Sequence, residues 1–456
     1  MAAVFPIFSG QDEARHYSAI QYLAEPTDKT WDLKELPERD DDNLETYGFS
    51  EEVQKTATAT DTHILRGEIF NTIGFSDGSD GKNEEVIHSM PWKPYNFNLK
   101  PDNVGGGKLY HPAAALIEKA LVDQDILVRF YSLRIISVLL GTLAVLFFYL
   151  TAKTIGFSEK TSLLLTAIVS FQPKFSMYGA SITYDALLIP AFFLFTLAGA
   201  MAFKNGLDWK NSTLLIISAT LGFLAKLTGF VLIAVLVSIF IYFIYQKIKT
   251  RNKNIRYITY ILCASSFLFL FSYIKDYLPG AEQSLAQLAG SLGKYLDKSL
   301  TFGRFGLSAR TYWGALGWTD GHIMDGIVEA IKYIEIISLA GLGIFFFSKK
   351  ERPAYLPEKK YIAFFVFMVI ALQLEIRVAD WSIFNQSGAL GLGTPGRYFL
   401  PNLSAHIILI FTGLGALFAY FKRGHYFEKS LVIGAISMLY FSTYLIFNAI
   451  ILRYYL

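Results

Sequence analysis

The chain has 456 residues, of which 53% are hydrophobic and only 17% are charged. This composition is too apolar for a soluble protein of that length, and it indicates a membrane protein that crosses the bilayer several times. The net charge of +3 says little, because acidic residues prevail before residue 125 and basic residues prevail in later short loops. The single cysteine, Cys263, excludes an internal disulfide, a CxxC metal site and a cysteine redox pair.

The chain opens with a polar and acidic region, residues 1–125, none of which could span a bilayer. Near its start, Asp12, Glu13 and His16 fall within five residues, ahead of apolar residues at helical spacing. Ser9 followed by Asp12 also fits a capping box, in which the acids would simply start a helix and complement its dipole. The spacing alone leaves a helix start and a functional cluster equally open.

About ten apolar segments follow, each close to the roughly 20 residues that a transmembrane helix needs. We predict membrane helices at 126–151, 161–180, 184–203, 211–226, 228–246, 257–274, 327–347, 361–379, 399–420 and 430–452. Basic residues cluster in three of the connections, 247–256, 349–360 and 422–429. Taken in order, the spans place these three loops on one side, which the positive-inside rule makes cytoplasmic. The outer side then carries the long segments 1–125, 275–326 and 380–398.

A large outer N-terminal region has to be carried across the membrane, yet residues 1–5 hold neither a signal peptide nor a first helix. We therefore expect a first transmembrane helix upstream of this start, with residues 1–5 as its tail. Translocation of the region without such a helix is the alternative.

Unusual polar residues collect in the outer loops. The loop 295–326 alternates aromatic residues with glycine and includes Arg304, so it could form an interfacial aromatic belt or a wall for an isoprenoid chain or sugar ring. In 391–401, a Gly-Thr-Pro-Gly run places Arg397 at the outer start of a helix. The unpaired backbone N–H groups at a helix start and the guanidinium of Arg397 would both favour binding of a phosphate there. Anchoring of this arginine in lipid headgroups is the alternative.

Ionisable residues inside apolar spans are costly and indicate function by default. Lys174 and Asp185 lie near the outer ends of adjacent spans, where they could pair with each other. Lys226 lies at another outer turn, where it could reach the surface or neutralise a lipid phosphate. Glu375 and Arg377, near the outer end of a later span, are first interpreted as an interfacial ion pair.

An ordered set of short motifs resembles the GT-C superfamily of membrane glycosyltransferases, and within it a bacterial family of predicted multi-spanning membrane proteins of unknown function. The matching stretches cover nearly the whole chain: Pro6 to His16, Tyr110 to Pro112, Gln172 to Lys174, Thr183 to Asp185, Ala225 to Gly229, Phe302 to Trp318 and Gly396 to Pro401. The chain departs from the pattern after Pro112, where many relatives carry a second proline. Its polar region before residue 110 is also longer than a minimal first outer loop.

The resemblance implies an all-α polytopic bundle of about ten transmembrane helices with long outer-face loops. It implies an enzyme that moves a sugar from a polyprenyl-phosphate carrier to a glycan, lipid or protein acceptor. An acidic residue of the first outer loop would act as base or help to hold a metal, and that position falls on Asp12, with Glu13 adjacent. Basic residues near the membrane surface would hold the lipid phosphate, and the candidates are Arg397, Lys226, Arg304 and Lys174. The further site candidates in these motifs are His16, His111, Asp185 and Tyr398.

This chemistry suits the residue types. A departing polyprenyl phosphate gains negative charge that cations or a metal must stabilise. A carboxylate beside the acceptor hydroxyl can remove its proton, which is worth about 10²–10⁴-fold in rate. A single in-line attack with one base predicts an inverted product, and a partly dehydrated carboxylate is expected to have a raised pKa. No cofactor is certain, although Asp12, Glu13 and His16 could ligate a divalent cation, Mg²⁺ or Mn²⁺.

We expect the protein in the cytoplasmic (inner) membrane of a bacterium, with its active site facing outside, membrane lipids around it and no nucleic-acid partner. A lipid-linked-sugar flippase or transporter is the main alternative, although such proteins place charges and broken helices near the midplane. A polysaccharide polymerase or ligase is a nearer alternative, because it shares the lipid-linked donor.

Overall fold

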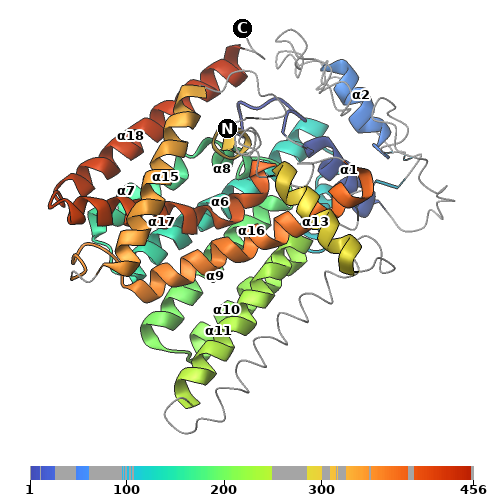
Figure 1. The fold of residues 1–456 in the computed structure, drawn as a ribbon. Helices are drawn as coiled ribbons and strands as arrows, with labels where there is room; N and C mark the ends of the chain where they lie inside the picture. Colours follow the sequence, from blue (N-terminus) through green and yellow to red (C-terminus); the bar gives the residue numbers. More distant parts are fainter. Residues whose placement is uncertain are drawn as a thin grey trace.

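The computed structural model describes residues 2–10, 12–25, 48–60, 95, 97, 100–101, 104, 107–248, 285–299, 309–314, 316, 325–348, 351–388 and 395–452. Every regular element in these ranges is helical (Figure 1). Seven helical segments in the described ranges are long and apolar enough to cross a bilayer. The prediction of an all-α polytopic membrane protein is confirmed.

The segments of membrane-crossing length are built on α6 (Ile126–Thr154), α9 (Asp185–Asn205), α11 (Phe230–Ile248), α15 (Asp325–Phe347), α16 (Lys359–Ser387), α17 (Leu403–Tyr420) and α18 (Tyr426–Ile446). The shorter helices are α1 (Glu13–Ala24), α2 (Glu51–Ala59), α5 (Tyr110–Ala120), α7 (Glu159–Ser170), α8 (Pro173–Tyr178), α10 (Trp209–Ala225) and α13 (Leu285–Ser299). Three tighter or wider turns complete the set: the 3₁₀ segments η3 (Leu227–Gly229) and η4 (Gly396–Asn402), and the π-helical segment η5 (Phe447–Ile451).

The predicted helix at 161–180 is wrong as a single span. α7 ends at Ser170 and α8 begins at Pro173, because the proline ring lacks the N–H that would continue the helix but fits the first position of a new one. The side chain of Gln172 accepts a hydrogen bond from the Phe175 N–H and caps this second helix. The predicted span at 257–274 lies outside the described residues.

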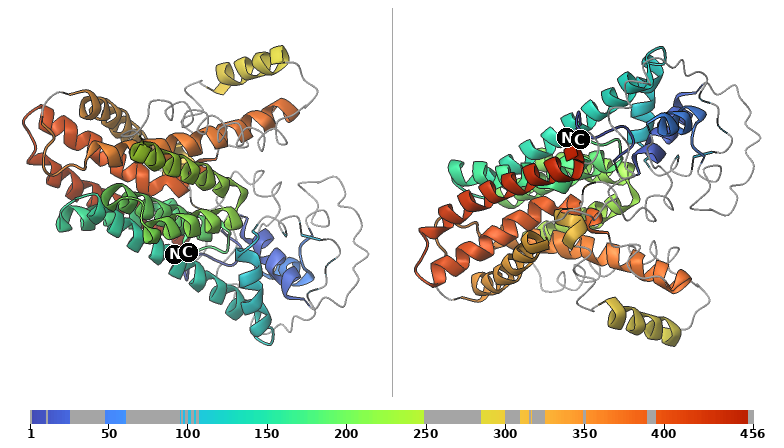
Figure 2. Two further views of the ribbon diagram at one scale, coloured as in Figure 1. Left: turned by 90° about the horizontal axis from the view of Figure 1, so that it is seen from below. Right: turned by 90° about the horizontal axis from the view of Figure 1, so that it is seen from above.

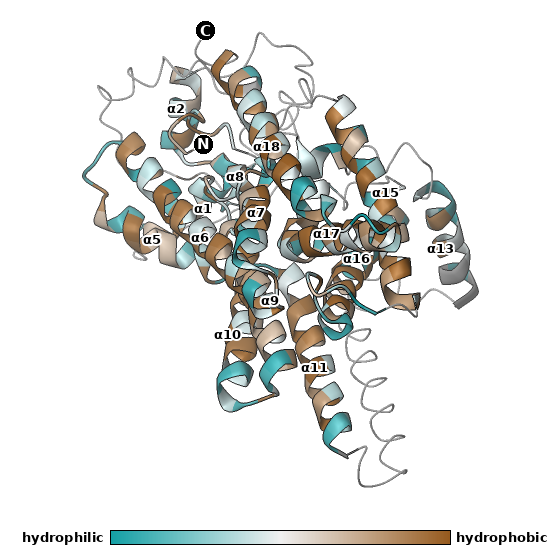
Figure 3. Ribbon diagram, turned by 90° about the vertical axis from the view of Figure 1, so that its left-hand side faces the viewer, coloured by the Kyte–Doolittle hydropathy of each residue, from teal (hydrophilic) through white to brown (hydrophobic). Residues whose placement is uncertain are grey.

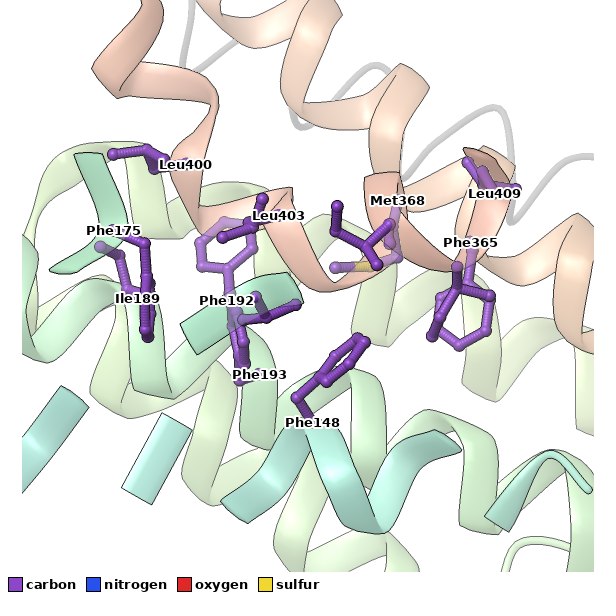
Figure 4. Packing of buried hydrophobic residues seen from close by; sticks show 14 of the residues in the cluster. Phe148, Phe175, Ile189, Phe192, Phe193, Phe365, Met368, Leu400, Leu403 and Leu409 are labelled. Atoms are coloured by element: carbon purple, nitrogen blue, oxygen red, sulfur yellow. The ribbon is translucent and has the colours of Figure 1, made fainter. Parts of the chain in front are cut away.

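Helix α9 lies at the centre of the bundle and packs against α6, α10 and η4. Its aromatic residues Phe192 and Phe193 are fully buried, and Figure 4 shows them beside Leu403 of α17 and Met368 of α16. Helices gain little from hydrophobic burial against one another inside a bilayer, so such close van der Waals packing is what joins them.

Small residues bring α15 and α17 into direct backbone contact. A Cβ added to Gly341 would lie 2.0 Å from the carbonyl oxygen of Gly413. Only glycine fits at this crossing, which is the small-residue packing typical of membrane helices.

Several helices expose large apolar side chains, and hydrophobic residues, coloured brown, prevail along most of the helices in Figure 3. On α6, α15 and α18, the exposed examples include Leu139, Leu339 and Ile436, each at least 60% exposed. Apolar exposure on this scale is expected where helices contact lipid.

The described part of residues 1–125 packs against one end of the bundle, beside the start of α6 (Figures 1 and 2). A second apolar core, which includes Tyr17, Val53 and Phe130, joins α1, α2 and α5 to α6. Buried ion pairs from Arg129 to Glu52 and Glu118 reinforce the junction. The first turn of α1 is itself attached to α6 by the buried ion pair of Glu13 with Arg134.

Candidate functional site

The backbone at Asp12 has a left-handed conformation, with φ 60° and ψ 11°. This conformation is uncommon for a residue other than glycine, and strained residues of this kind gather at functional sites. Asp12 occupies the N-cap position of α1, but within the described ranges no side chain caps the helix there and the buried Ser9 hydroxyl has no hydrogen-bond partner. The capping-box interpretation is therefore wrong, and the Asp12 carboxylate is directed elsewhere.

The Asp12 carboxylate contacts two arginines. Oδ2 lies 3.0 Å from Nη2 of Arg397, and Oδ1 lies 3.4 Å from Nη1 of Arg15. The Asp12 and Arg397 side chains are 15% and 14% exposed, so the pair is mostly buried but still accessible to a small group. The fold thus joins the first and last motifs of the chain.

The pKa of Asp12 is lowered from its usual value of 3.8. Burial alone raises it, but the charges of Arg397, Arg15 and Lys226 together lower it by more. The expectation of a raised pKa for this carboxylate is wrong, because the cations that the fold brings to it outweigh the effect of dehydration.

Lys226 forms the second cationic position. Its Nζ lies 3.2 Å from Oδ1 of Asp185, 4.4 Å from the ring centroid of Tyr398 and 4.8 Å from that of Tyr184. The guanidinium of Arg397 lies 5.2 Å from the same Tyr398 ring. One aromatic ring therefore lies beside both cations, as in cation–π pairs.

A close backbone approach shapes the turn that carries Lys226. A Cβ added to Gly229 would lie 1.9 Å from the carbonyl oxygen of Gly222, so only glycine fits in η3 where it meets α10. Lys226 itself is extended and ends α10. Asp185 pairs with Lys226 in the structure, so the alternative in which Asp185 pairs with Lys174 is wrong.

Tyr178 links Lys174 to Arg397. The Lys174 side chain is buried, and its Nζ lies 5.5 Å from the Tyr178 ring centroid. The Tyr178 hydroxyl accepts a hydrogen bond of 3.4 Å from Nη1 of Arg397. Arg304 lies outside the described residues.

Glu13 has a different environment from its neighbour Asp12. Its Oε1 accepts hydrogen bonds from Nε of Arg134 at 2.9 Å and from the Ile182 N–H at 2.9 Å. Its Oε2 accepts from Nη2 of Arg134 at 2.7 Å and from the Gly10 N–H at 3.0 Å. Four protein donors therefore occupy a carboxylate that is completely buried.

His16 and His111 form a buried pair, with Nδ1 of His16 2.9 Å from Nε2 of His111. Nε2 of His16 lies 3.3 Å from the Thr183 hydroxyl, and its ring meets the Tyr184 ring edge-on at 4.5 Å. Burial, followed by the neighbouring His111 and Arg15, holds the pKa of His16 well below 6.5. The His16 ring is therefore neutral at pH 7.

Asp12, Glu13 and His16, which the sequence allowed as ligands of a divalent cation, do not fit one, because the three side chains turn to different partners. Asp12 faces arginines, Glu13 is enclosed by Arg134, and His16 bonds to His111. Within the described ranges, no group of three or more His, Cys, Asp or Glu side chains could hold a metal ion.

Two residues of the site were not predicted correctly from the sequence. Arg134 was missed, although an arginine inside an apolar span is itself an indication of a specific role. Glu375 was expected to pair with Arg377, and this is wrong: its Oε2 is buried with no hydrogen-bond partner in the described part of the chain. Glu375 interacts electrostatically with Lys226.

Residues 112–275 match the family model of dolichyl-phosphate-mannose-protein mannosyltransferases. The match covers a little over a third of the chain, and it includes Lys174, Asp185 and Lys226 but neither Asp12 nor Arg397. Comparison with curated proteins and with solved structures gave no match. The family match supports the membership of the GT-C superfamily of membrane glycosyltransferases that the motifs predicted.

Proposed function

We propose that this chain transfers a sugar from a polyprenyl-phosphate carrier to a glycan, lipid or protein acceptor, at the outer face of a bacterial inner membrane. One observation carries the proposal. Lys226 and Arg397, from distant parts of the sequence, lie beside the ring of Tyr398, and Asp12 of the first motif pairs with Arg397. The family match over residues 112–275 supports the same class of reaction.

Arg397 and Lys226 would bind the phosphate of the donor. A guanidinium and an ammonium beside the same ring offer several N–H donors to phosphate oxygens, and such charge-assisted hydrogen bonds are stronger than neutral ones. Among the described residues, Arg397 contacts the carboxylate of Asp12 and Lys226 contacts that of Asp185. A phosphate that binds here competes with both carboxylates for the cations.

This competition would activate Asp12 as the base. Arg397 is the main cause that lowers the pKa of Asp12, whereas burial raises it. When a phosphate neutralises Arg397 and Lys226, the effect of burial remains and the pKa of Asp12 rises. Asp12 then becomes a stronger base only while the donor is bound.

In the chemical step, the acceptor hydroxyl oxygen attacks the anomeric carbon of the sugar and its proton passes to Asp12. The bond from the anomeric carbon to the phosphate oxygen breaks, and its electron pair leaves with the polyprenyl phosphate. Arg397 and Lys226 stabilise the charge that develops on this leaving group. Attack from the opposite side inverts the anomeric configuration.

Glu13 would position the site rather than take a proton. Its four hydrogen bonds from Arg134, Gly10 and Ile182 leave no lone pair for an acceptor hydroxyl. These bonds fix the turn that presents Asp12. The mechanism includes no metal-dependent step.

The test is transfer from a panel of radiolabelled polyprenyl-phosphate sugars in membranes that contain the protein. We expect the wild type to transfer the sugar from one donor, and the transfer rate of Asp12→Asn to be at least about 100-fold lower. Glu351→Gln, which changes an exposed carboxylate between α15 and α16, should keep the wild-type rate. Full activity of Asp12→Asn would exclude Asp12 as base. Transport of the lipid-linked sugar without transfer would favour a flippase, and joining of whole lipid-linked chains would favour a polymerase or ligase.

A further inference from the structure

The carboxyl group of Glu375 has an oxygen atom without a hydrogen bond in the described part of the chain. It lies on α16, which packs against η3, directly after Lys226, and against η4, which carries Arg397. Its Oε2 atom is buried and has no hydrogen-bond partner in the described part of the chain. The charge of Lys226 interacts electrostatically with Glu375.

The neighbouring charges do not explain this carboxyl group. Lys226 donates its hydrogen bond to Asp185, at 3.2 Å, and not to Glu375. Buried carboxyl oxygens normally have a hydrogen-bond donor, because removing them from water without one costs free energy. An ionisable group of this kind inside a membrane helix indicates a functional role.

We infer that Glu375 binds the sugar of the donor and determines which sugars are accepted. The inference rests on the proposed function, in which Lys226 holds the phosphate attached to the anomeric carbon. The ring hydroxyl nearest to that phosphate is the one on carbon 2, and the free Oε2 of Glu375 accepts its hydrogen bond. The donor is therefore a sugar with a free 2-hydroxyl group.

A site that hydrogen-bonds a substrate hydroxyl discriminates strongly against the analogue without it, because the protein group is then left buried and unpaired. A carboxylate that only balances the charge of Lys226 would not discriminate in this way. Its removal would change the reaction of all donors by the same factor.

The experiment compares two donors in the purified protein: the polyprenyl-phosphate sugar that the wild type accepts and its 2-deoxy analogue. For each variant we take the ratio of kcat/KM for the two donors. Comparing this ratio between variants removes the intrinsic difference in reactivity between the donors, because that difference is the same for every variant. We expect Glu375→Leu to reduce this ratio by about 10- to 150-fold, the range for a hydrogen bond to a charged group. Glu375→Gln, which keeps an acceptor oxygen, should give an intermediate ratio and guards against misfolding of the leucine variant.

Asp380→Asn is the matched control, because it removes a carboxylate from the same helix that already accepts a hydrogen bond from Tyr295. Its ratio should equal that of the wild type. An unchanged ratio in both Glu375 variants would overturn the inference. If the wild type binds donors but transfers none, the proposed function fails, and the same ratio taken from dissociation constants still tests Glu375.

Discussion

Replacing Glu13 by glutamine tests whether this residue positions the site or takes part in the chemistry. In the structure, both carboxylate oxygens accept hydrogen bonds from Arg134, and each accepts one more from a backbone N–H. The amide of glutamine would direct an NH₂ group at two of these donors. It would also remove the carboxylate charge that pairs with the buried guanidinium of Arg134.

The expected cost follows from these contacts. Removing one partner of a buried ion pair typically destabilises a protein by about 3–5 kcal/mol. Each backbone donor left unpaired adds about 1–3 kcal/mol, although such contributions are not additive. We therefore expect Glu13→Gln to lose at least about 3 kcal/mol of stability, with the loss centred on the turn that holds Asp12.

The assay is thermal and denaturant unfolding of the purified protein in detergent, alongside transfer activity. The double variant Glu13→Leu, Arg134→Met should recover part of the stability, because an apolar pair replaces the unpaired charge. Asp12→Asn should lose activity with a smaller change in stability. If Glu13→Gln unfolds like the wild type yet loses activity, Glu13 acts in the chemistry and this interpretation is refuted.

Three further predictions concern the same site. Arg397→Gln should raise KM for the donor. It should also move the acid limb of the kcat/KM profile to higher pH, because the charge that most lowers the pKa of Asp12 is gone. An acid limb that does not move would show that Arg397 does not control the pKa of Asp12. Thermal stability should fall as pH drops below about 6.5. The reason is that His16 binds a proton in the unfolded state, whereas its lowered pKa keeps the ring neutral in the folded state. A His16→Gln variant that shows the same loss of stability would contradict this. Gly229→Ala should reduce donor affinity, since its Cβ would collide with the Gly222 carbonyl beside Lys226. Gly343→Ala is the control, because its Cβ would enter open space and should leave the affinity unchanged. Equal donor affinities of the two variants in binding assays would contradict this prediction.

The sequence predicted the helices well because the length of an apolar run sets the length of a membrane helix. The break between α7 and α8 was missed, although Pro173 marks it, because mean hydropathy does not register a proline. The motifs also selected Asp12, Lys226 and Arg397, which the structure brings together.

Pairings between these residues could not be predicted, because they depend on how the helices pack. Asp185 is closer in sequence to Lys174, but α9 and α10 place it against Lys226. Asp12 and Glu13 are adjacent acids with equal claims in the sequence, and only the fold separates them: one faces Arg397 and the other is enclosed by Arg134. The lowered pKa of Asp12 has the same origin, since its cations come from distant segments.

The most direct test of the account is a single-turnover reaction of the purified protein with its donor and acceptor, in which sugar transfer and release of polyprenyl phosphate are measured together. We predict that the wild type forms both products in equal amounts with inverted anomeric configuration. Asp12→Asn should bind the donor but react about 10²–10⁴-fold more slowly. Equal rates in the two proteins, or a product with retained configuration, would contradict the central claim that Asp12 is the base of a direct displacement.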